Sequence, residues 1–196
     1  MANNPYQHAD FRTRKARDQG YPARSVFKLE EIDRRIRLIK PNMKVLDLGA
    51  APGSWSMYAS QHVGAGGRVL AIDLKPIDRP LGSNVTFLQG NATAIAREVL
   101  VGHGPFDVVL SDMAPSTTGF GQVDEIRSAE LFMRAVDVAA EVGAQGSTFV
   151  GKLFMGASFE EARTHLRERF SKVRIIRPEG TRRCSVETFL VGLERK

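Results

Sequence analysis

Short apolar segments alternate with amphipathic segments along most of this 196-residue chain. The apolar segments have the length of buried strands, and the segments between them repeat apolar residues every three or four positions, as helices do. The predicted helices span 24–39, 53–63, 93–100, 125–142 and 159–170, and the predicted strands span 45–49, 68–74, 84–90, 106–112, 146–154, 172–178 and 185–194. Because such alternation produces a mostly parallel sheet covered on both faces, we expect an α/β fold with about seven strands. The last two strands are joined by a segment too short for a crossover helix, so we expect them to pair antiparallel.

The composition favours a single domain. Hydrophobic residues make up 42% of the chain and charged residues 26%, which provides enough apolar surface for a core. Residues 1–20 are polar and charged, and we expect them to form a basic N-terminal arm, mobile or ordered by a partner, ahead of one domain at 21–196. The first residues lack the apolar core of a signal peptide, no segment is apolar for long enough to span a bilayer, and a single cysteine excludes an intramolecular disulfide. We therefore expect a cytoplasmic protein with no membrane association.

Charge is distributed unevenly along the chain. The net charge is +5 over residues 1–40, −4 over 41–150 and +5 over 151–196, which gives +6 in total. If the two basic ends meet in space, they form one positive face, and such a face attracts a polyanion such as RNA or DNA. Alternatively, these Lys and Arg residues serve only to keep the protein soluble.

Polar residues and glycines follow each of the first three predicted strands. Asp47 and Gly49 end the first strand and Gly53 follows in the next loop, Asp73 ends the second strand, and Asn91 follows the third. Ligands of open α/β sheets bind at the carboxyl ends of the strands, where glycines let the backbone approach closely and an acidic side chain can bind both hydroxyls of a ribose. These positions predict a cofactor that carries adenosine, unless they are ordinary turn residues.

The loop after the first strand, Ala-Ala-Pro-Gly-Ser-Trp, indicates which cofactor this is. It has neither the G-x-G-x-x-G spacing of dinucleotide-binding loops nor the Gly-Lys-Ser/Thr of a P-loop. Pro52 also removes a backbone N–H that a pyrophosphate would use. S-adenosylmethionine contains no phosphate, so it fits this loop.

Five motifs resemble those of the FtsJ/RrmJ-type ribosomal RNA 2'-O-ribose methyltransferases. They are SVFKLEEID at 25–33, DLGAAPGSWS at 47–56, SDMAP at 111–115, GKLF at 151–154 and SVETF at 185–189. The resemblance runs from about residue 20 to the end of the chain. It implies a Rossmann-like S-adenosylmethionine-dependent methyltransferase, monomeric, that acts on a uridine of large-subunit (23S-type) ribosomal RNA in the ribosomal particle.

The same resemblance implies the residues of the site. It places a catalytic tetrad at Lys28, Asp112, Lys152 and Glu187, and cofactor contacts at Gly53, Trp55, Asp73 and Asp112. Methyl transfer to a ribose 2'-hydroxyl requires the oxygen in line with the methyl group and removal of its proton. Lys152 is the candidate for this step, either as a general base or as a cation that stabilises the developing alkoxide. Because Lys152 interrupts the apolar segment TFVGKLF, where an unpaired charge is costly, we expect it to have a carboxylate partner.

One residue departs from the family pattern. Asn91 stands where the family usually has an acidic residue. Its amide oxygen can still accept a hydrogen bond from an adenine amino group, but without the strengthening that a charge provides. We therefore expect somewhat weaker binding of the cofactor.

Basic residues near both ends of the sequence are candidates for contacts with RNA phosphates. They are Arg12, Arg14, Lys15, Arg17, Arg24, Arg34, Arg182 and Arg183. The four histidines are scattered and no cysteine pair occurs, so no metal site is predicted. The predicted function is 2'-O-methylation of large-subunit ribosomal RNA. The alternatives are the same reaction on transfer RNA or an mRNA cap, an assembly factor that binds RNA without catalysis, and a small-molecule methyltransferase.

Overall fold

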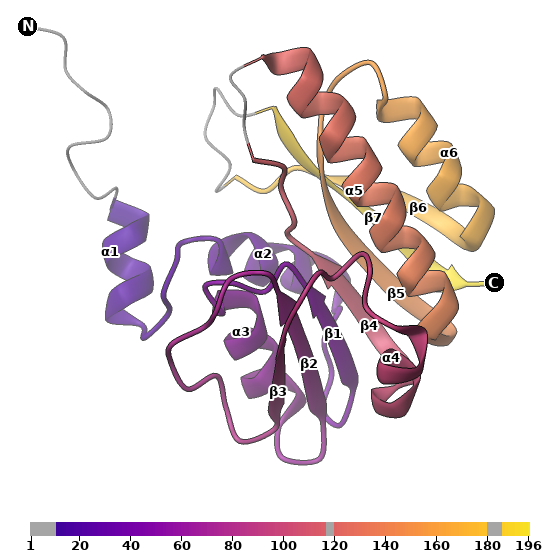
Figure 1. Cartoon of the computed structure of the whole chain (residues 1–196). Helices are drawn as coiled ribbons and strands as arrows, with labels where there is room; N and C mark the ends of the chain where they lie inside the picture. Colours follow the sequence, from indigo (N-terminus) through magenta and orange to yellow (C-terminus); the bar gives the residue numbers. More distant parts are fainter. Residues whose placement is uncertain (1–10, 117–119, 180–185) are drawn as a thin grey trace, which may run out of the picture.

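The computed structural model describes residues 11–116, 120–179 and 186–196, and within them one seven-stranded sheet forms the centre of the molecule (Figure 1). The strands are β1 (Lys44–Leu48), β2 (Arg68–Asp73), β3 (Val85–Gln89), β4 (Phe106–Ser111), β5 (Gly143–Phe154), β6 (Phe170–Ile176) and β7 (Glu187–Arg195). Their order across the sheet is β3-β2-β1-β4-β5-β7-β6. The first five pair in parallel, and β7 pairs antiparallel with both β5 and β6. The predicted α/β fold and the antiparallel last strands are confirmed.

The central strands are apolar because both faces of the sheet are covered. In β1, all residues from Val45 to Leu48 are buried, and in β2 the four residues from Val69 to Ile72 are buried. Strands buried on both faces read as continuous apolar runs and not as an alternation. The edge strand β6 instead has exposed residues between its two buried ends.

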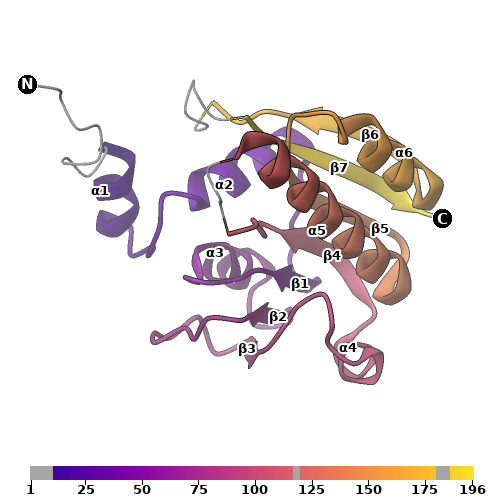
Figure 2. The same cartoon turned by 45° about the horizontal axis from the view of Figure 1, so that its top comes forward.

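The described part of the chain has six helices, of which α2 to α6 lie against the sheet, while α1 stands to one side of α2 and α3 (Figures 1 and 2). They are α1 (Phe11–Asp18), α2 (Val26–Ile36), α3 (Ser54–Val63), α4 (Arg97–His103), α5 (Gly121–Val142) and α6 (Phe159–Arg169). Side chains of α4, α5 and α6 share one apolar core with the sheet, and side chains of α1, α2 and α3 share the other. The result is a three-layer arrangement with a separate core on each side of the sheet.

Helix α2 is held firmly at its C-terminal end. Its last turn leads into Arg37 in the left-handed conformation, with φ of 52°. The buried Asp33 accepts hydrogen bonds from the backbone N–H of Ile39 at 2.9 Å and from the hydroxyl of Tyr58 at 2.9 Å. These bonds tie α2 to α3 and to the chain that enters β1, so the side chains of α2 have a defined position over the sheet.

Several elements differ in their bounds from the prediction, among them α2, which ends at Ile36, β5, which begins at Gly143, and β6, which spans Phe170–Ile176. Residues 11–18 of the expected arm form α1, in which Ala16 is fully buried. Helix α4 begins at Arg97 and not at residue 93, because residues 91–93 form a turn closed by the Asn91 side chain. Helix α5 begins four residues earlier than expected, at Gly121. The proposed boundary between residues 20 and 21 remains a prediction.

Among residues 11–116, 120–179 and 186–196, no helix combines the length and the apolarity that a membrane span requires.

Candidate active site

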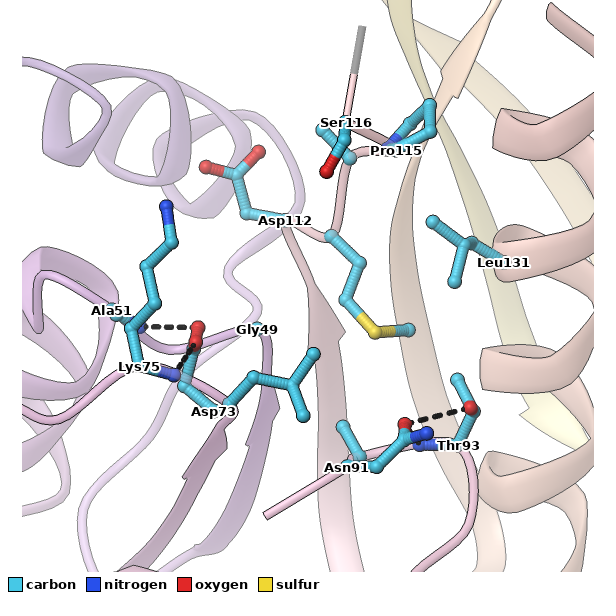
Figure 3. Close-up of a pocket in the computed structure, with 14 residues that line it drawn as sticks. Gly49, Ala51, Asp73, Lys75, Asn91, Thr93, Asp112, Pro115, Ser116 and Leu131 are labelled. Atoms are coloured by element: carbon cyan, nitrogen blue, oxygen red, sulfur yellow. Dashed lines mark hydrogen bonds between the residues drawn. The ribbon is translucent and has the colours of Figure 1, made fainter. Parts of the chain in front are cut away.

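A cavity of about 420 Å³ opens at the carboxyl ends of the parallel strands, where the loops after β1 and β4 meet (Figure 3). This is the point at which the strand order reverses, since β1 is followed by β2 on one side and by β4 on the other. Open α/β sheets bind ligands at such a point. Fourteen residues line the cavity: Gly49, Ala51, Asp73, Leu74, Lys75, Asn91, Ala92, Thr93, Asp112, Met113, Ala114, Pro115, Ser116 and Leu131.

Two glycines shape the loop after β1. Gly49 has φ of +80°, and a Cβ there would lie 2.6 Å from Cγ of Met113 in the loop after β4. Gly53 has φ of +104°, and a Cβ there would lie 2.4 Å from a methyl carbon of Leu81. Both positions need a residue without a side chain. Gly49 lines the cavity, whereas Gly53, a predicted cofactor contact, lies outside the lining and starts α3.

Asp73 is held by two backbone donors. Its Oδ2 accepts the N–H of Ala51 at 2.8 Å, and its Oδ1 accepts the N–H of Lys75 at 2.8 Å (Figure 3). Each carboxylate oxygen has further lone pairs, which can accept hydrogen bonds from a ligand. The backbone therefore presents an oriented carboxylate to the cavity, as recognition of two ribose hydroxyls requires.

Asn91 lies at the opposite end of the cavity from Asp112 (Figure 3). Its Oδ1 accepts hydrogen bonds from the N–H of Thr93 at 3.0 Å and from the Thr93 hydroxyl at 2.8 Å. Thr93 thus supplies a donor for each lone pair of this oxygen, and a hydrogen bond from an adenine amino group, which stays a prediction, requires the Thr93 hydroxyl to turn away. The amide NH₂ is the group that can meet a ligand, as a donor to a ring nitrogen.

Asp47 lies inside the protein and not in the cavity wall. It is fully buried, and its Oδ2 accepts the hydroxyl of Ser56 at 2.6 Å, while its Oδ1 accepts no hydrogen bond from the described residues. Burial, together with the negative charges of Asp112 and Asp73, raises the pKa of Asp47 to about 7. The prediction of a direct cofactor contact at Asp47 does not fit this position, because no surface of the side chain reaches the cavity.

Trp55 also takes an interior position. Its side chain is 2% exposed, its Nε1–H donates to the carbonyl of Ser25 at 2.9 Å, and its ring packs against Phe189 with centroids 5.8 Å apart. The structure therefore places Trp55 between the start of α2 and β7, outside the cavity lining.

Lys152 and Asp112 form one of two charged pairs beside the cavity. The parallel register of β4 and β5 sets Ser111 opposite Gly151, so the next residues, Asp112 and Lys152, are neighbours. Lys152 Nζ donates a hydrogen bond to the backbone carbonyl of Asp112 at 2.6 Å. It also lies 2.9 Å from Asp112 Oδ1, and this second contact is an ion pair without hydrogen-bond geometry. The Lys152 side chain is only 10% exposed. The expected carboxylate partner of Lys152 is confirmed.

Lys28 and Glu187 form the second charged pair. Lys28 Nζ on α2 donates to Glu187 Oε1 at the start of β7, and both side chains are 14% exposed. The β5–β7 register sets Lys152 opposite Phe189 and Phe154 opposite Glu187. Residues two apart on a strand point to one face, so Lys152 and Glu187 are diagonal neighbours on the same face of the sheet. The structure thus brings all four residues of the predicted tetrad to one place.

The candidate RNA contacts have mixed positions. Arg14, Lys15, Arg17 and Arg34 are exposed on α1 and α2. Arg12 donates to the backbone carbonyl of Glu179 at 3.1 Å, and Arg24 is half-buried and engaged within the protein. Arg182 and Arg183 lie outside the described residues.

Some residues of the site were not expected from the sequence. Ser54 Oγ accepts the N–H of Ala23 at 2.9 Å and donates to the carbonyl of Ala23 at 3.1 Å, which fastens the chain before α2 to the start of α3. Lys75 and Thr93 line the cavity. The Asn-x-Thr spacing at 91–93 is a turn signal that would have indicated Thr93. Within residues 11–116, 120–179 and 186–196, no group of three or more His, Cys, Asp and Glu side chains could hold a metal ion.

Comparisons with known proteins agree with the geometry. The model of the FtsJ-like methyltransferase family matches residues 21–195. The chain is 60% identical over 193 residues, or 98% of its length and 91% of the relative's, to ribosomal RNA large subunit methyltransferase E of Sorangium cellulosum (strain So ce56). A solved ribosomal RNA methyltransferase of Plasmodium falciparum has a TM-score of 0.76 at 24% identity, covering 89% of this chain and 98% of that one.

A more distant structure has the same fold. Aeropyrum pernix fibrillarin with natively bound S-adenosyl-L-methionine has a TM-score of 0.61 at 14% identity, covering 80% of this chain and 68% of that one. The family match over nearly the whole chain bears out the resemblance that the sequence motifs carry. The chain belongs to the FtsJ-like methyltransferase family and is a methyltransferase that depends on S-adenosylmethionine.

Proposed function

We propose that the protein transfers a methyl group to a ribose 2'-hydroxyl of large-subunit ribosomal RNA, on a uridine presented in the ribosomal particle. The observation that carries the reaction is the pairing of Lys152 with Asp112 at the edge of the cavity, with Lys28 and Glu187 beside them on the same sheet face. The 60% identity to a relative named for the ribosomal RNA large subunit supports the substrate.

The cavity fits S-adenosylmethionine by the chemistry of its polar groups. Asp73 offers an oriented carboxylate for the ribose hydroxyls, Asn91 offers an amide for the adenine edge, and Asp112 offers negative charge to the amino-acid end. Pro52 leaves the loop after β1 without one of the N–H groups that a phosphate would need. When bound, S-adenosylmethionine supplies a methyl group on a positively charged sulfur, which is an electrophile without further activation.

Lys152 is the residue that acts on the proton of the 2'-hydroxyl in this proposal. Its Nζ is held by the carbonyl and the carboxylate of Asp112, so it has a defined position and little access to water. As a neutral amine, a positioned lysine can take the proton from the oxygen, whereas as the ammonium that pairs with Asp112 it can stabilise the negative charge that develops there. Lys28, which Glu187 holds in place, adds a second positive charge near the same oxygen.

The exposed basic residues of α1 and α2 are proposed to contact RNA phosphates. Arg14, Arg17 and Arg34 are exposed on α1 and α2, whose buried side chains pack in the core on the face with the tetrad. Such contacts position the RNA without reading its sequence, and they weaken as the salt concentration rises. We further propose that the protein acts as a monomer in the cytoplasm.

Transfer of labelled methyl groups from S-adenosylmethionine tests this function. The acceptors are unmodified large ribosomal subunits, free large-subunit ribosomal RNA and transfer RNA, with Lys152→Ala as the control. We expect label in subunit RNA, recovered as 2'-O-methylated nucleoside and absent with the variant. Label only in transfer RNA would overturn the substrate, and label in no RNA despite cofactor binding would overturn the reaction.

A further inference from the structure

Helix α2 holds both ends of the connection between β6 and β7. Glu31 and Lys28 lie one turn apart on α2. Glu31 Oε2 accepts the backbone N–H of Glu179, which follows β6, at 2.9 Å. Lys28 pairs with Glu187, the first residue of β7. Two neighbouring side chains of α2 thus contact the chain at Glu179 and at Glu187, on either side of residues 180–185, which lie outside the described residues.

The carboxylate of Glu31 is built into this contact and not exposed to solvent. Glu31 is 8% exposed, and its other oxygen, Oε1, accepts a hydrogen bond from Arg35 on the same helix. A carboxylate that accepts a backbone N–H in a largely dry environment makes a strong, charge-assisted hydrogen bond. Glu31 does not line the cavity and has no part in the proposed reaction.

Glu179 is a meeting point of three elements. Its N–H is held by Glu31 of α2, and its carbonyl accepts Arg12 Nη1 of α1 at 3.1 Å. Both contacts span more than a hundred residues of sequence, since Glu31 is 148 positions and Arg12 167 positions from Glu179. The backbone at Glu179 therefore follows the position of α2.

The first residues of β7 contact both neighbouring strands and α2. Towards β5, Glu187 lies opposite Phe154, and the carbonyl of Val186 accepts the N–H of Met155 at 2.7 Å. Towards β6, the ladder ends at the pair of Ile176 and Phe189, and the hydroxyl of Thr188 donates to the carbonyl of Ile176 at 3.5 Å. After the end of β6, Glu31 of α2 holds the backbone at Glu179.

We propose that Glu31 is a positioning residue for the reaction, which acts by docking α2 against the backbone at Glu179 so that Lys28, one turn away on the same helix, meets Glu187. This inference rests on the proposed function, because it assigns Glu31 an effect on the tetrad. It extends the site by one residue that touches neither the substrate nor the cofactor.

Three variants separate this role from a general effect on folding. Glu31→Ala removes the acceptor for the Glu179 N–H, and we expect the single-turnover rate to fall about tenfold, since a small misplacement of a catalytic group is costly. The affinity for S-adenosylmethionine should not change. Glu31→Gln keeps an acceptor oxygen and should retain most of the rate. Arg35→Ala removes the other partner of Glu31 and should leave the rate close to wild type.

A double-mutant cycle with Glu187→Gln gives the decisive readout. If Glu31 acts through Glu187, adding Glu31→Ala to Glu187→Gln should lower the single-turnover rate by less than about twofold, whereas the two losses of rate would multiply if the residues acted independently. Multiplying effects, or an equal loss with Arg35→Ala, would overturn the inference.

Hydrogen exchange tests the role of Glu31 without an activity measurement, so its outcome does not depend on the proposed function. Glu31→Ala should speed amide exchange at residues 186–188, and Glu31→Gln should not. Unchanged exchange in Glu31→Ala would overturn the inference whatever the activity. If the wild-type protein methylates no RNA, or if Glu187→Gln retains full activity, the proposed function or its tetrad fails instead.

Discussion

The cofactor cavity and the paired charges of the tetrad are neighbouring regions that are built in different ways. In the cavity, backbone N–H groups of the loops at the strand ends orient polar side chains, as those of Ala51 and Lys75 do for Asp73 and that of Thr93 does for Asn91. In the tetrad, the partners are far apart in sequence: Lys152 is 40 positions from Asp112, and Lys28 is 159 positions from Glu187. The cavity therefore needs only the parallel half of the sheet, whereas the tetrad also needs β7 in place and α2 docked.

This difference predicts a division of work between the two regions. Residues of the cavity should control affinity for S-adenosylmethionine, and the lysines of the tetrad should control the rate of transfer. Asp112 belongs to both regions, because it lines the cavity and pairs with Lys152. Asp47 lies buried where the negative charges of both Asp73 and Asp112 reach it.

The largest effect is expected for Lys152→Ala. The single-turnover rate of methyl transfer should fall by about 10²–10⁴-fold, the range that a positioned acid–base group contributes. Affinity for S-adenosylmethionine should hold, since Lys152 is not among the residues that line the cavity. Lys75→Ala is the matched control, because Lys75 lines the cavity and should keep its rate at saturating cofactor. Weaker binding of S-adenosylmethionine by Lys152→Ala would contradict the assignment of affinity to the cavity and of rate to the lysines of the tetrad.

The next effect concerns stability and comes from Asp47, whose pKa burial raises from 3.8 to about 7. Between these values the folded protein keeps a proton that the unfolded chain has lost, so stability falls as the pH rises, by at most about 1.4 kcal/mol per pH unit from this group. Above the folded value the loss is complete and the contribution is constant. Asp47→Asn should remove this slope and be more stable than wild type at alkaline pH.

Urea unfolding of both proteins at several pH values, from about 5 to about 8, measures this slope. Asn keeps an oxygen that can accept the hydroxyl of Ser56, so the variant changes the charge more than the packing. Equal slopes for the two proteins would show that Asp47 is not the titrating group.

A smaller effect is expected for Asp73→Asn. Both oxygens of Asp73 accept backbone N–H groups, so an amide must turn its NH₂ against one of these donors. The dissociation constant for S-adenosylmethionine should rise about ten- to a hundredfold, as for the loss of hydrogen bonds to a charged group. The rate at saturating cofactor should change little. Asp78→Asn, an exposed carboxylate in the following loop, is the control for charge alone and should leave the calorimetric affinity unchanged.

The smallest effect is expected for Asn91→Asp. One carboxylate oxygen can replace the amide oxygen in the turn with Thr93, and the other then faces the cavity as a charged acceptor for an adenine amino group. The affinity for S-adenosylmethionine should improve by about two- to fivefold, a modest gain from one charge-assisted bond. Weaker binding would mean that the present NH₂ group is the better partner for the ligand.

The sequence predicted those parts of the site whose position depends only on neighbouring residues in the chain. The seven strands follow from apolar runs, and Asp73 and Asn91 are placed by the strands that precede them. The family motifs indicated the four tetrad residues, and the cost of a buried charge indicated that Lys152 has a carboxylate partner. Neither signal shows that this partner is Asp112 or that Glu187 belongs to Lys28, because strand register and the docking of α2 decide these pairs.

Two physical reasons explain what the sequence did not predict. Asp47 and Trp55 sit in the cofactor motif, but their side chains point into the protein, where Asp47 Oδ2 accepts the hydroxyl of Ser56 and Trp55 Nε1 donates to the carbonyl of Ser25. A motif gives the position of a residue in the chain and not the direction of its side chain. Helix α1 was missed because it is polar almost throughout and is held by the single buried Ala16 and by contacts far along the chain.

Asp112 joins the cavity to the tetrad, and measuring affinity and rate together on one preparation of Asp112→Asn tests this link. We expect the dissociation constant for S-adenosylmethionine to rise and the single-turnover rate at saturating cofactor to fall, because the variant removes a charge both from the cavity and from Lys152. A change in only one of the two quantities would show that Asp112 serves one region alone.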